Sequence, residues 1–153
     1  MKDILIEISE MPIEEQIAML LKKANNKIEE EYFLAQELAQ EALKIAQNRF
    51  YTKGIADSSK QLASCYLSVS NYGEVMQYAL QAKELYESLD DKVGQANCLN
   101  TLGFVYNFTG DYKKRLACNF ECLELREQAN DFKGKLSTLS NIGDTYTVLK
   151  DYD

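Results

Sequence analysis

Four cysteines are the most reactive side chains of this chain, and two of them lie one helical turn apart. Cys118 and Cys122 are separated by four residues, a spacing that places both thiols on one face of a helix, where they could share a metal ion. A zinc site takes four ligands, however, and the chain has no histidine and no second close cysteine pair. We therefore expect Cys65, Cys98, Cys118 and Cys122 to be reduced core residues, with no metal bound.

Other catalytic patterns are also missing from the sequence. The seven glycines are spread along the chain, so none of them forms a phosphate-binding loop. Without histidine there is no Ser–His or Cys–His nucleophile. The carboxylates of Glu29–Glu31 are typical of a solvated helix face. We expect this chain to bind no cofactor and not to be an enzyme.

Charge and hydropathy narrow the range of partners. The net charge of −7 disfavours phosphate backbones and anionic lipid, so we expect neither nucleic-acid nor membrane binding. A basic peptide would be attracted, although mild acidity is also a common means of solubility. The first residues do not form a secretion signal, and no segment approaches the roughly 18 apolar residues of a membrane span. We expect a cytoplasmic protein.

Internal repetition is what predicts the fold. Gly54, Gly94 and Gly134 lie 40 residues apart. Five more sets keep this spacing: Leu62, Leu102 and Ile142; Ala63, Gly103 and Gly143; Tyr66, Tyr106 and Tyr146; Asn71, Asp111 and Asp151; Tyr72, Tyr112 and Tyr152. Six registers that share one period predict an array of structural repeats.

Each unit has the pattern of an antiparallel helix pair. Leu99, Leu102 and Tyr106 form the apolar stripe of the first helix. Gly110 suits the end of that helix, and Asp111 can cap the next one, as Asp131 can one helix later. The inward face of the second helix is predicted to contain Tyr112, Leu116, Asn119 or Phe120, and Leu123.

The N-terminal part follows the same plan more loosely. Pro12 suits the first turn of a helix, Asn25 and Asn26 predict its end, and residues 1–11 could form an extra turn or a strand-like arm. We expect seven helices, near 12–25, 28–49, 53–69, 72–89, 92–109, 112–129 and 132–149.

The run Leu102-Gly103-Phe104-Val105-Tyr106, followed by Gly110-Asp111-Tyr112, resembles the core of the tetratricopeptide repeat, or TPR. The repeat period is 40 residues rather than about 34, and the proline that closes the common repeat is absent. In both respects the chain is similar to a subclass found in kinesin light chains, spindle-orienting adaptors and bacterial peptide-sensing regulators. The resemblance implies an all-α, right-handed superhelix of three and a half repeats. The predicted parts are an arm over 1–11, an atypical repeat over 12–50, repeats over 53–91 and 92–131, and an incomplete repeat over 132–153.

This resemblance implies a non-catalytic module that binds a protein or peptide. Similar arrays form the N-terminal sensory or scaffolding part of intracellular bacterial signalling proteins such as histidine kinases and nucleotide cyclases. A free-standing adaptor that binds a linear peptide or a partner protein is the alternative.

By alignment with the family, one stripe of each first helix lines the concave face that would bind the partner. The predicted binding residues are Asp57, Lys60, Ser64, Asn97, Asn100, Phe104, Asn107, Ser140 and Asp144. On the helix predicted over 92–109, this stripe consists of Phe104 and three asparagines that flank it, Asn97, Asn100 and Asn107. Their side-chain amides could pair with a peptide backbone. A groove without a dedicated ligand, or a Phe104 that packs on the neighbouring first helix, would explain the same pattern.

The sequence stops where a second helix would begin. Leu136, Leu139, Ile142, Tyr146 and Leu149 are apolar positions that this helix would cover. We therefore expect a fragment of a longer protein, which self-associates through its uncapped last helix.

Overall fold

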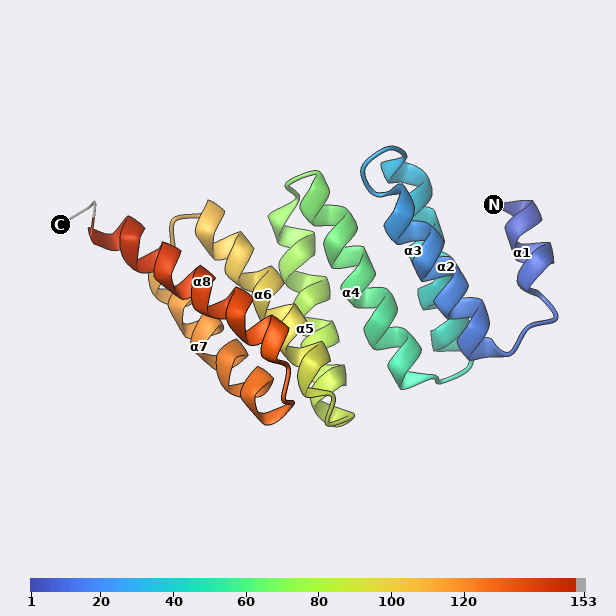
Figure 1. Cartoon of the computed structure of the whole chain (residues 1–153). Helices are drawn as coiled ribbons and strands as arrows, with labels where there is room; N and C mark the ends of the chain where they lie inside the picture. Colours follow the sequence, from blue (N-terminus) through green and yellow to red (C-terminus); the bar gives the residue numbers. More distant parts are fainter. Residues whose placement is uncertain (151–153) are drawn as a thin grey trace. The chain divides into compact units, whose positions relative to one another are not determined.

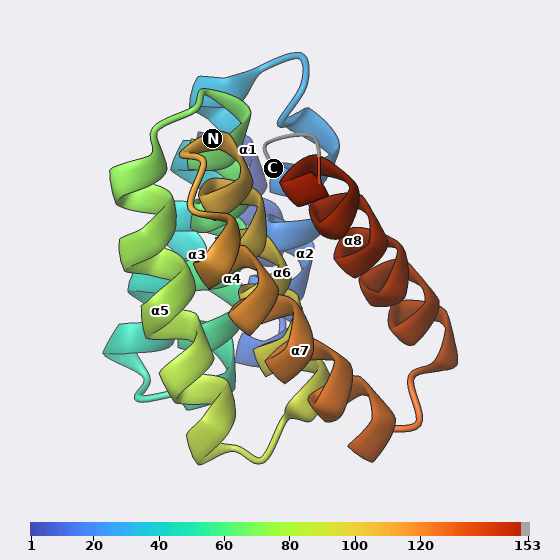
Figure 2. The ribbon, with the colours of Figure 1, turned by 90° about the vertical axis from the view of Figure 1, so that its left-hand side faces the viewer.

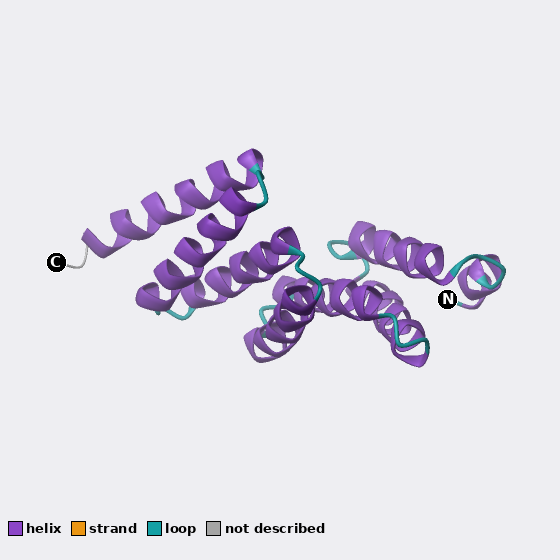
Figure 3. Ribbon diagram, turned by 90° about the horizontal axis from the view of Figure 1, so that it is seen from below, coloured by secondary structure: helices purple, strands orange, loops and turns teal. Residues whose placement is uncertain are grey.

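A computed structural model describes residues 1–150 of the chain, and every regular element in that range is an α-helix (Figures 1 and 3). The helices are α1 (Lys2–Ile8), α2 (Ile13–Lys27), α3 (Tyr32–Asn48), α4 (Thr52–Ser68), α5 (Tyr72–Ser88), α6 (Lys92–Phe108), α7 (Tyr112–Gln128) and α8 (Phe132–Lys150). Within the described residues, no helix is long and apolar enough to cross a membrane.

The predicted repetition is present in the helices. Each of α3 to α7 has 17 residues, and each is followed by a three-residue turn. Tyr66, Tyr106 and Tyr146 consequently take the same position in α4, α6 and α8. These observations confirm a helical repeat with the 40-residue period.

The five turns between α3 and α8 share one backbone conformation. The middle residue of each has a positive φ: Phe50 (53°), Ser70 (56°), Asp90 (51°), Gly110 (77°) and Asn130 (55°). At Gly110 the backbone N–H donates to the carbonyl of Asn107 (3.3 Å), and the next N–H, of Asp111, donates to Tyr106 (2.9 Å). This is the Schellman ending that left-handed residues give a helix, and it confirms the role predicted for Gly110.

Aspartates start three of the helices. Oδ1 of Asp111 accepts from the N–H of Lys114 (3.1 Å), and Oδ1 of Asp131 accepts from that of Gly134 (2.9 Å). Both predicted caps are therefore confirmed. Asp91 caps α6 in the same way, through the N–H of Gly94 (2.7 Å).

The N-terminal region differs from the prediction. Residues 1–11 contain the short helix α1, so the described residues form eight helices and not seven. Ile8 of α1 is buried in the core of the first unit, and Glu7 pairs with Lys23 of α2 (3.2 Å). Pro12 precedes α2 as its N-cap instead of lying within its first turn.

The predicted break at Asn25–Asn26 is wrong. Helix α2 continues through both residues to Lys27, and α3 begins only at Tyr32. In a helix, asparagine is less favourable than an average residue by only about a few tenths of a kcal/mol. Asparagine alone, without a glycine or proline, therefore does not end a helix. The turn falls instead at residues 28–31, where Lys27 pairs with Glu31.

By contact density the chain divides into two compact units, Met1–Leu85 and Tyr86–Asp153. The core of the first unit is formed by α1 to α4, with Leu20 of α2, Leu38 of α3 and Leu62 of α4 fully buried. Small side chains on α3, such as Ala39 and Ala42, let these helices approach closely.

The second unit contains the end of α5 and helices α6, α7 and α8. Leu99 and Ala96 of α6 pack against Cys122 of α7, with Cys118 and Leu125 beside them. The turns between α6, α7 and α8 reverse the chain, so that α7 runs antiparallel to each of its neighbours (Figure 2).

The glycines at 40-residue spacing have a packing role. A Cβ on Gly54 would lie 3.0 Å from Cβ of Ala46, and one on Gly94 would lie 2.8 Å from Cε1 of Tyr86. A Cβ on Gly134 would lie 2.6 Å from Cζ of Arg126. In each case the glycine makes room for the residue eight positions earlier, at the end of the preceding helix.

Candidate functional site

The three asparagines of α6 are joined to the neighbouring helices. Their side-chain oxygens accept hydrogen bonds as follows: Asn97 from Nη2 of Arg126 (3.3 Å), Asn100 from Nδ2 of Asn141 (3.0 Å), and Asn107 from Nη1 of Arg115 (2.7 Å). All three are half-buried. The row expected on a solvated surface therefore also connects α6 to α7 and α8, and its carboxamide nitrogens remain as donors for a ligand.

The predicted inward face of α7 is only partly right: of the alternatives Asn119 and Phe120, Asn119 is the buried one. The residues that it buries are Arg115, Asn119, Cys122 and Arg126, whereas Tyr112, Leu116 and Leu123 are half-buried and Phe120 is exposed. The predicted inward face included Asn119 as one alternative, but neither arginine. The arginines lie inside because Asn97 and Asn107 of α6, and Asp131 in the turn before α8, accept their hydrogen bonds, which makes their burial tolerable.

A small pocket lies where α6, α7 and α8 meet. It is lined by Asn100, Gly103, Phe104, Arg115, Asn119 and Asn141. Its volume is about 10 Å³, which is room for about one water-sized atom. Nδ2 of Asn119 is buried without a hydrogen-bond partner among the described residues. Phe104, 43% exposed, lines this pocket.

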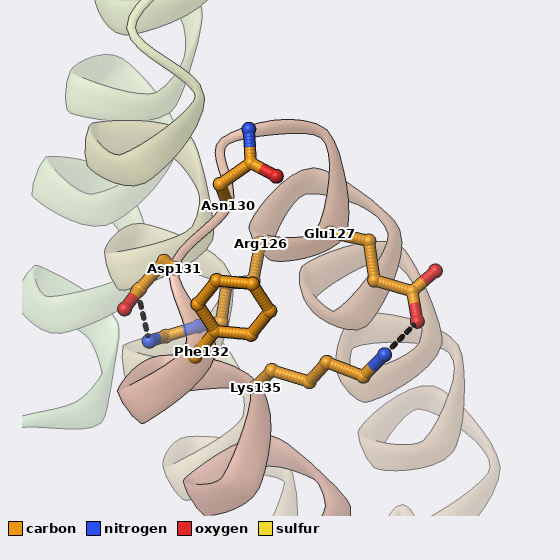
Figure 4. Close-up of a pocket in the computed structure, with 6 residues that line it drawn as sticks. All are labelled: Arg126, Glu127, Asn130, Asp131, Phe132 and Lys135. Carbon is orange, nitrogen blue, oxygen red and sulfur yellow. Dashed lines mark hydrogen bonds and ion pairs between the residues drawn. The ribbon is translucent and has the colours of Figure 1, made fainter.

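A second pocket lies at the turn between α7 and α8 (Figure 4). Its volume is about 160 Å³, and Arg126, Asp131 and Lys135 are among its lining residues. Nη1 of Arg126 lies 2.9 Å from Oδ2 of Asp131, and Lys135 pairs with Glu127, as the dashed lines in Figure 4 show. Since both cations already have carboxylate partners, this pocket offers no unpaired charge to a ligand.

The remaining predicted binding residues lie outside the small pocket. On α4, Asp57 pairs with Lys53 (2.7 Å), and Oγ of Ser64 donates to the carbonyl of Lys60 (3.3 Å). Ser140 and Asp144 are exposed on α8. Their role in binding a partner stays a prediction.

The cysteines are free thiols. Cys65, Cys98 and Cys122 are buried and Cys118 is half-buried. Burial raises the pKa of the Cys65 thiol to about 11, so this residue is protonated at neutral pH. Within residues 1–150, no group of three or more cysteine or acidic side chains is arranged to hold a metal ion.

The packing described above defines the class of the fold, which is an all-helical repeat of the kind that commonly binds proteins. No protein-family model matches the chain, and no curated protein matches it. Among solved structures, the fold is shared with BtubC (BKLC) from P. vanneervenii, with a TM-score of 0.81 and 19% sequence identity. The similarity covers 97% of this chain but only 63% of that one. At this identity the likeness concerns the fold alone.

Asn100 and Phe104, which the sequence predicted as binding residues, line one pocket together with Arg115, Asn119 and Asn141, which it did not predict. A signal for two of them was present. The residues equivalent to Arg115 one and two repeats earlier are Val75 and Ala35, and those equivalent to Asn119 are Ala79 and Ala39. A polar residue in an otherwise apolar register is a departure that the sequence alone reveals.

Proposed function

We propose that this chain is a non-catalytic module that binds a protein or peptide, and that its repeats are of the tetratricopeptide type with right-handed superhelical stacking. One observation carries the proposal. In the second unit, three helices bring carboxamides, a buried arginine and the partly exposed ring of Phe104 together around one pocket.

Each component suits the recognition of a polypeptide. Carboxamide groups both donate to and accept from backbone amides. A partly exposed aromatic ring provides an apolar anchor, and such anchors dominate the affinity of many interfaces. Because Asn100 is held by Asn141 at 3.0 Å, the surface is preorganised, and a ligand would lose less affinity to ordering of the protein.

The wider context that we propose is the N-terminal sensory or scaffolding part of an intracellular bacterial signalling protein. Its support is the resemblance of the Leu102–Tyr106 motif and of the 40-residue period to the arrays of such proteins.

Selection from a displayed library of random peptides tests the proposed function. We expect peptides that bind the native chain and lose at least about tenfold in affinity when Asn100→Ala and Phe104→Ala are combined, as for hot-spot residues. Lys133→Ala, at an exposed position of α8 outside the predicted binding residues, is the matched control and should leave binding unchanged. Failure to select any binder, or equal binding by the double variant, would reject this surface. Circular dichroism of the double variant checks that the helices are retained.

A further inference from the structure

Helix α7 breaks the apolar register of the helices that precede it. Val75 and Ala79 of α5 are buried, as their equivalents on α3 are. At the same two positions α7 carries Arg115 and Asn119, with only 8% and 2% of their surfaces exposed. Burying an arginine and a carboxamide where apolar side chains suffice costs folding free energy. Sites that break a local rule in this way are commonly functional.

The two buried arginines of α7 differ in how their charge is neutralised. Arg126 lies 2.9 Å from a carboxylate oxygen of Asp131 and also donates to Asn97 and to Sγ of Cys122. Arg115 has one side-chain partner among the described residues, the neutral carboxamide of Asn107 at 2.7 Å. One guanidinium is thus paired with a carboxylate, and the other is buried to the same extent without one.

A second donor beside Arg115 also lacks a partner. Nδ2 of Asn119 is buried with no acceptor in the described part of the chain. A Cβ on Gly103 would lie 3.3 Å from Oδ1 of Asn119, so the missing side chain at this position keeps the pocket open. The unpaired donors of Asn119 and the unneutralised charge of Arg115 line the same pocket.

We propose that this pocket binds a carboxylate group of the partner, with Arg115 as its counter-ion and Nδ2 of Asn119 as a second donor. A guanidinium and a carboxylate form short, charge-assisted hydrogen bonds, which are about twice as strong as neutral ones. A pocket that admits about one oxygen atom fits the end of a carboxylate. The group comes from an aspartate or glutamate side chain or from a peptide C-terminus, because both present the same two oxygens.

The net charge of the chain does not favour acidic ligands at long range. Arg115 therefore acts at contact, by selecting for one carboxylate at a defined position, rather than by attracting acidic peptides in general. This inference rests on the proposed function, in which the same surface of α6, α7 and α8 binds a polypeptide.

Three blocked tripeptides and acetate are the probes. Acetyl-Ala-Glu-Ala-amide carries a side-chain carboxylate, acetyl-Ala-Gln-Ala-amide is its neutral isostere, and acetyl-Ala-Gln-Ala with a free terminus carries a main-chain carboxylate. Binding is followed by the NMR shifts of the Arg115 Nε and Asn119 Nδ2 signals. We expect acetate and at least one acidic peptide to move both signals, with an affinity at least about tenfold above that of the neutral isostere. The more effective of the two acidic peptides identifies the source of the carboxylate.

Two variants connect the effect to the pocket. Arg115→Val and Asn119→Ala install the residues that the preceding repeat buries at the same positions, so both should fold. We expect Arg115→Val to remove the preference for the acidic peptide, as followed by the Asn119 signal. Lys113→Gln removes an equal charge from an exposed position of the same helix and should leave the preference unchanged.

Equal binding of the neutral isostere and of both acidic peptides would overturn the inference and leave peptide binding itself intact. A preference that persists in Arg115→Val, or no response to acetate and to either acidic peptide, would overturn it as well. Conversely, a carboxylate response at Arg115 with no binder from the peptide library would leave the pocket as an anion site and reject the proposed function.

Discussion

Replacing Gly134 with alanine should destabilise the protein, although alanine is the better helix former. The new Cβ would overlap Nη1 of Arg126 and Oδ2 of Asp131 and would lie 2.6 Å from Cζ of Arg126. These atoms belong to the ion pair between α7 and the start of α8, whose side chains are 10% and 25% exposed. The guanidinium can avoid the clash only by leaving Asp131, and it would also lose its bonds to Asn97 and Cys122.

The size of the effect follows from two opposing contributions. Breaking a buried ion pair costs about 3 to 5 kcal/mol, and the partial exposure of Asp131 places this pair at the lower limit. The replacement of glycine by alanine within a helix returns about 1 kcal/mol. The net loss is about 2 kcal/mol, which corresponds to a fall of about 4 to 8 °C in the melting temperature of a chain of this size.

The assay is thermal and urea unfolding followed by circular dichroism, with Gly143→Ala as the matched control. Gly143 lies on the same helix, is exposed, and has no atom within 4 Å of an added Cβ. The same substitution there should stabilise the protein by about 1 kcal/mol. If Gly134→Ala unfolds at or above the temperature of the native chain, then the clash with Arg126 does not control this position and the reasoning is refuted.

Three further predictions concern other parts of the chain. Phe50 is 91% exposed and has a φ of 53°, a left-handed conformation that is unfavourable for a residue with a side chain. Its replacement by glycine should stabilise the fold by about 1 kcal/mol, and an unchanged urea midpoint would contradict this. Leu136, 69% exposed on α8, should drive concentration-dependent self-association that Leu136→Glu abolishes in sedimentation; a native chain that stays monomeric at high concentration would count against it. Because the pKa of Cys65 is raised from 9.0 to about 11, the folded state holds its proton more tightly than the unfolded state does. Its contribution to stability should therefore fall as the pH rises from 9 towards 11, and Cys65→Ser should flatten that part of the pH profile.

The sequence predicted most of the fold because the repeat registers carry packing information. Gly94 and Gly134 recur because each faces a large side chain of the preceding helix, and Gly110 and Asp111 mark a turn by their own conformational preferences. The N-terminal region was harder because it lacks these registers. There the end of α2 depends on where the chain packs, and not on Asn25.

The candidate site was predictable only in part. Helical spacing placed Asn97, Asn100 and Phe104 in one row, as the structure does. It could not place Arg115 inside, because a charged side chain is buried only where other helices supply partners, and Asn107 does so from another element. Which acceptor lies opposite which donor is a property of tertiary packing that no periodicity encodes.

The three-residue turns, in which the middle residue has a positive φ, affect how such a chain can gain or lose repeats. Four different non-glycine residues occupy that position, so the reversal depends on the spacing of the flanking helices more than on any one amino acid. Duplication or loss of 40 residues adds or removes one pair of helices and preserves the kind of contact that each helix makes with its neighbours. A change of 20 residues would put a helix of the α5 and α7 type in the place of one of the α4 and α6 type, so gene rearrangements that preserve folding should come in whole pairs.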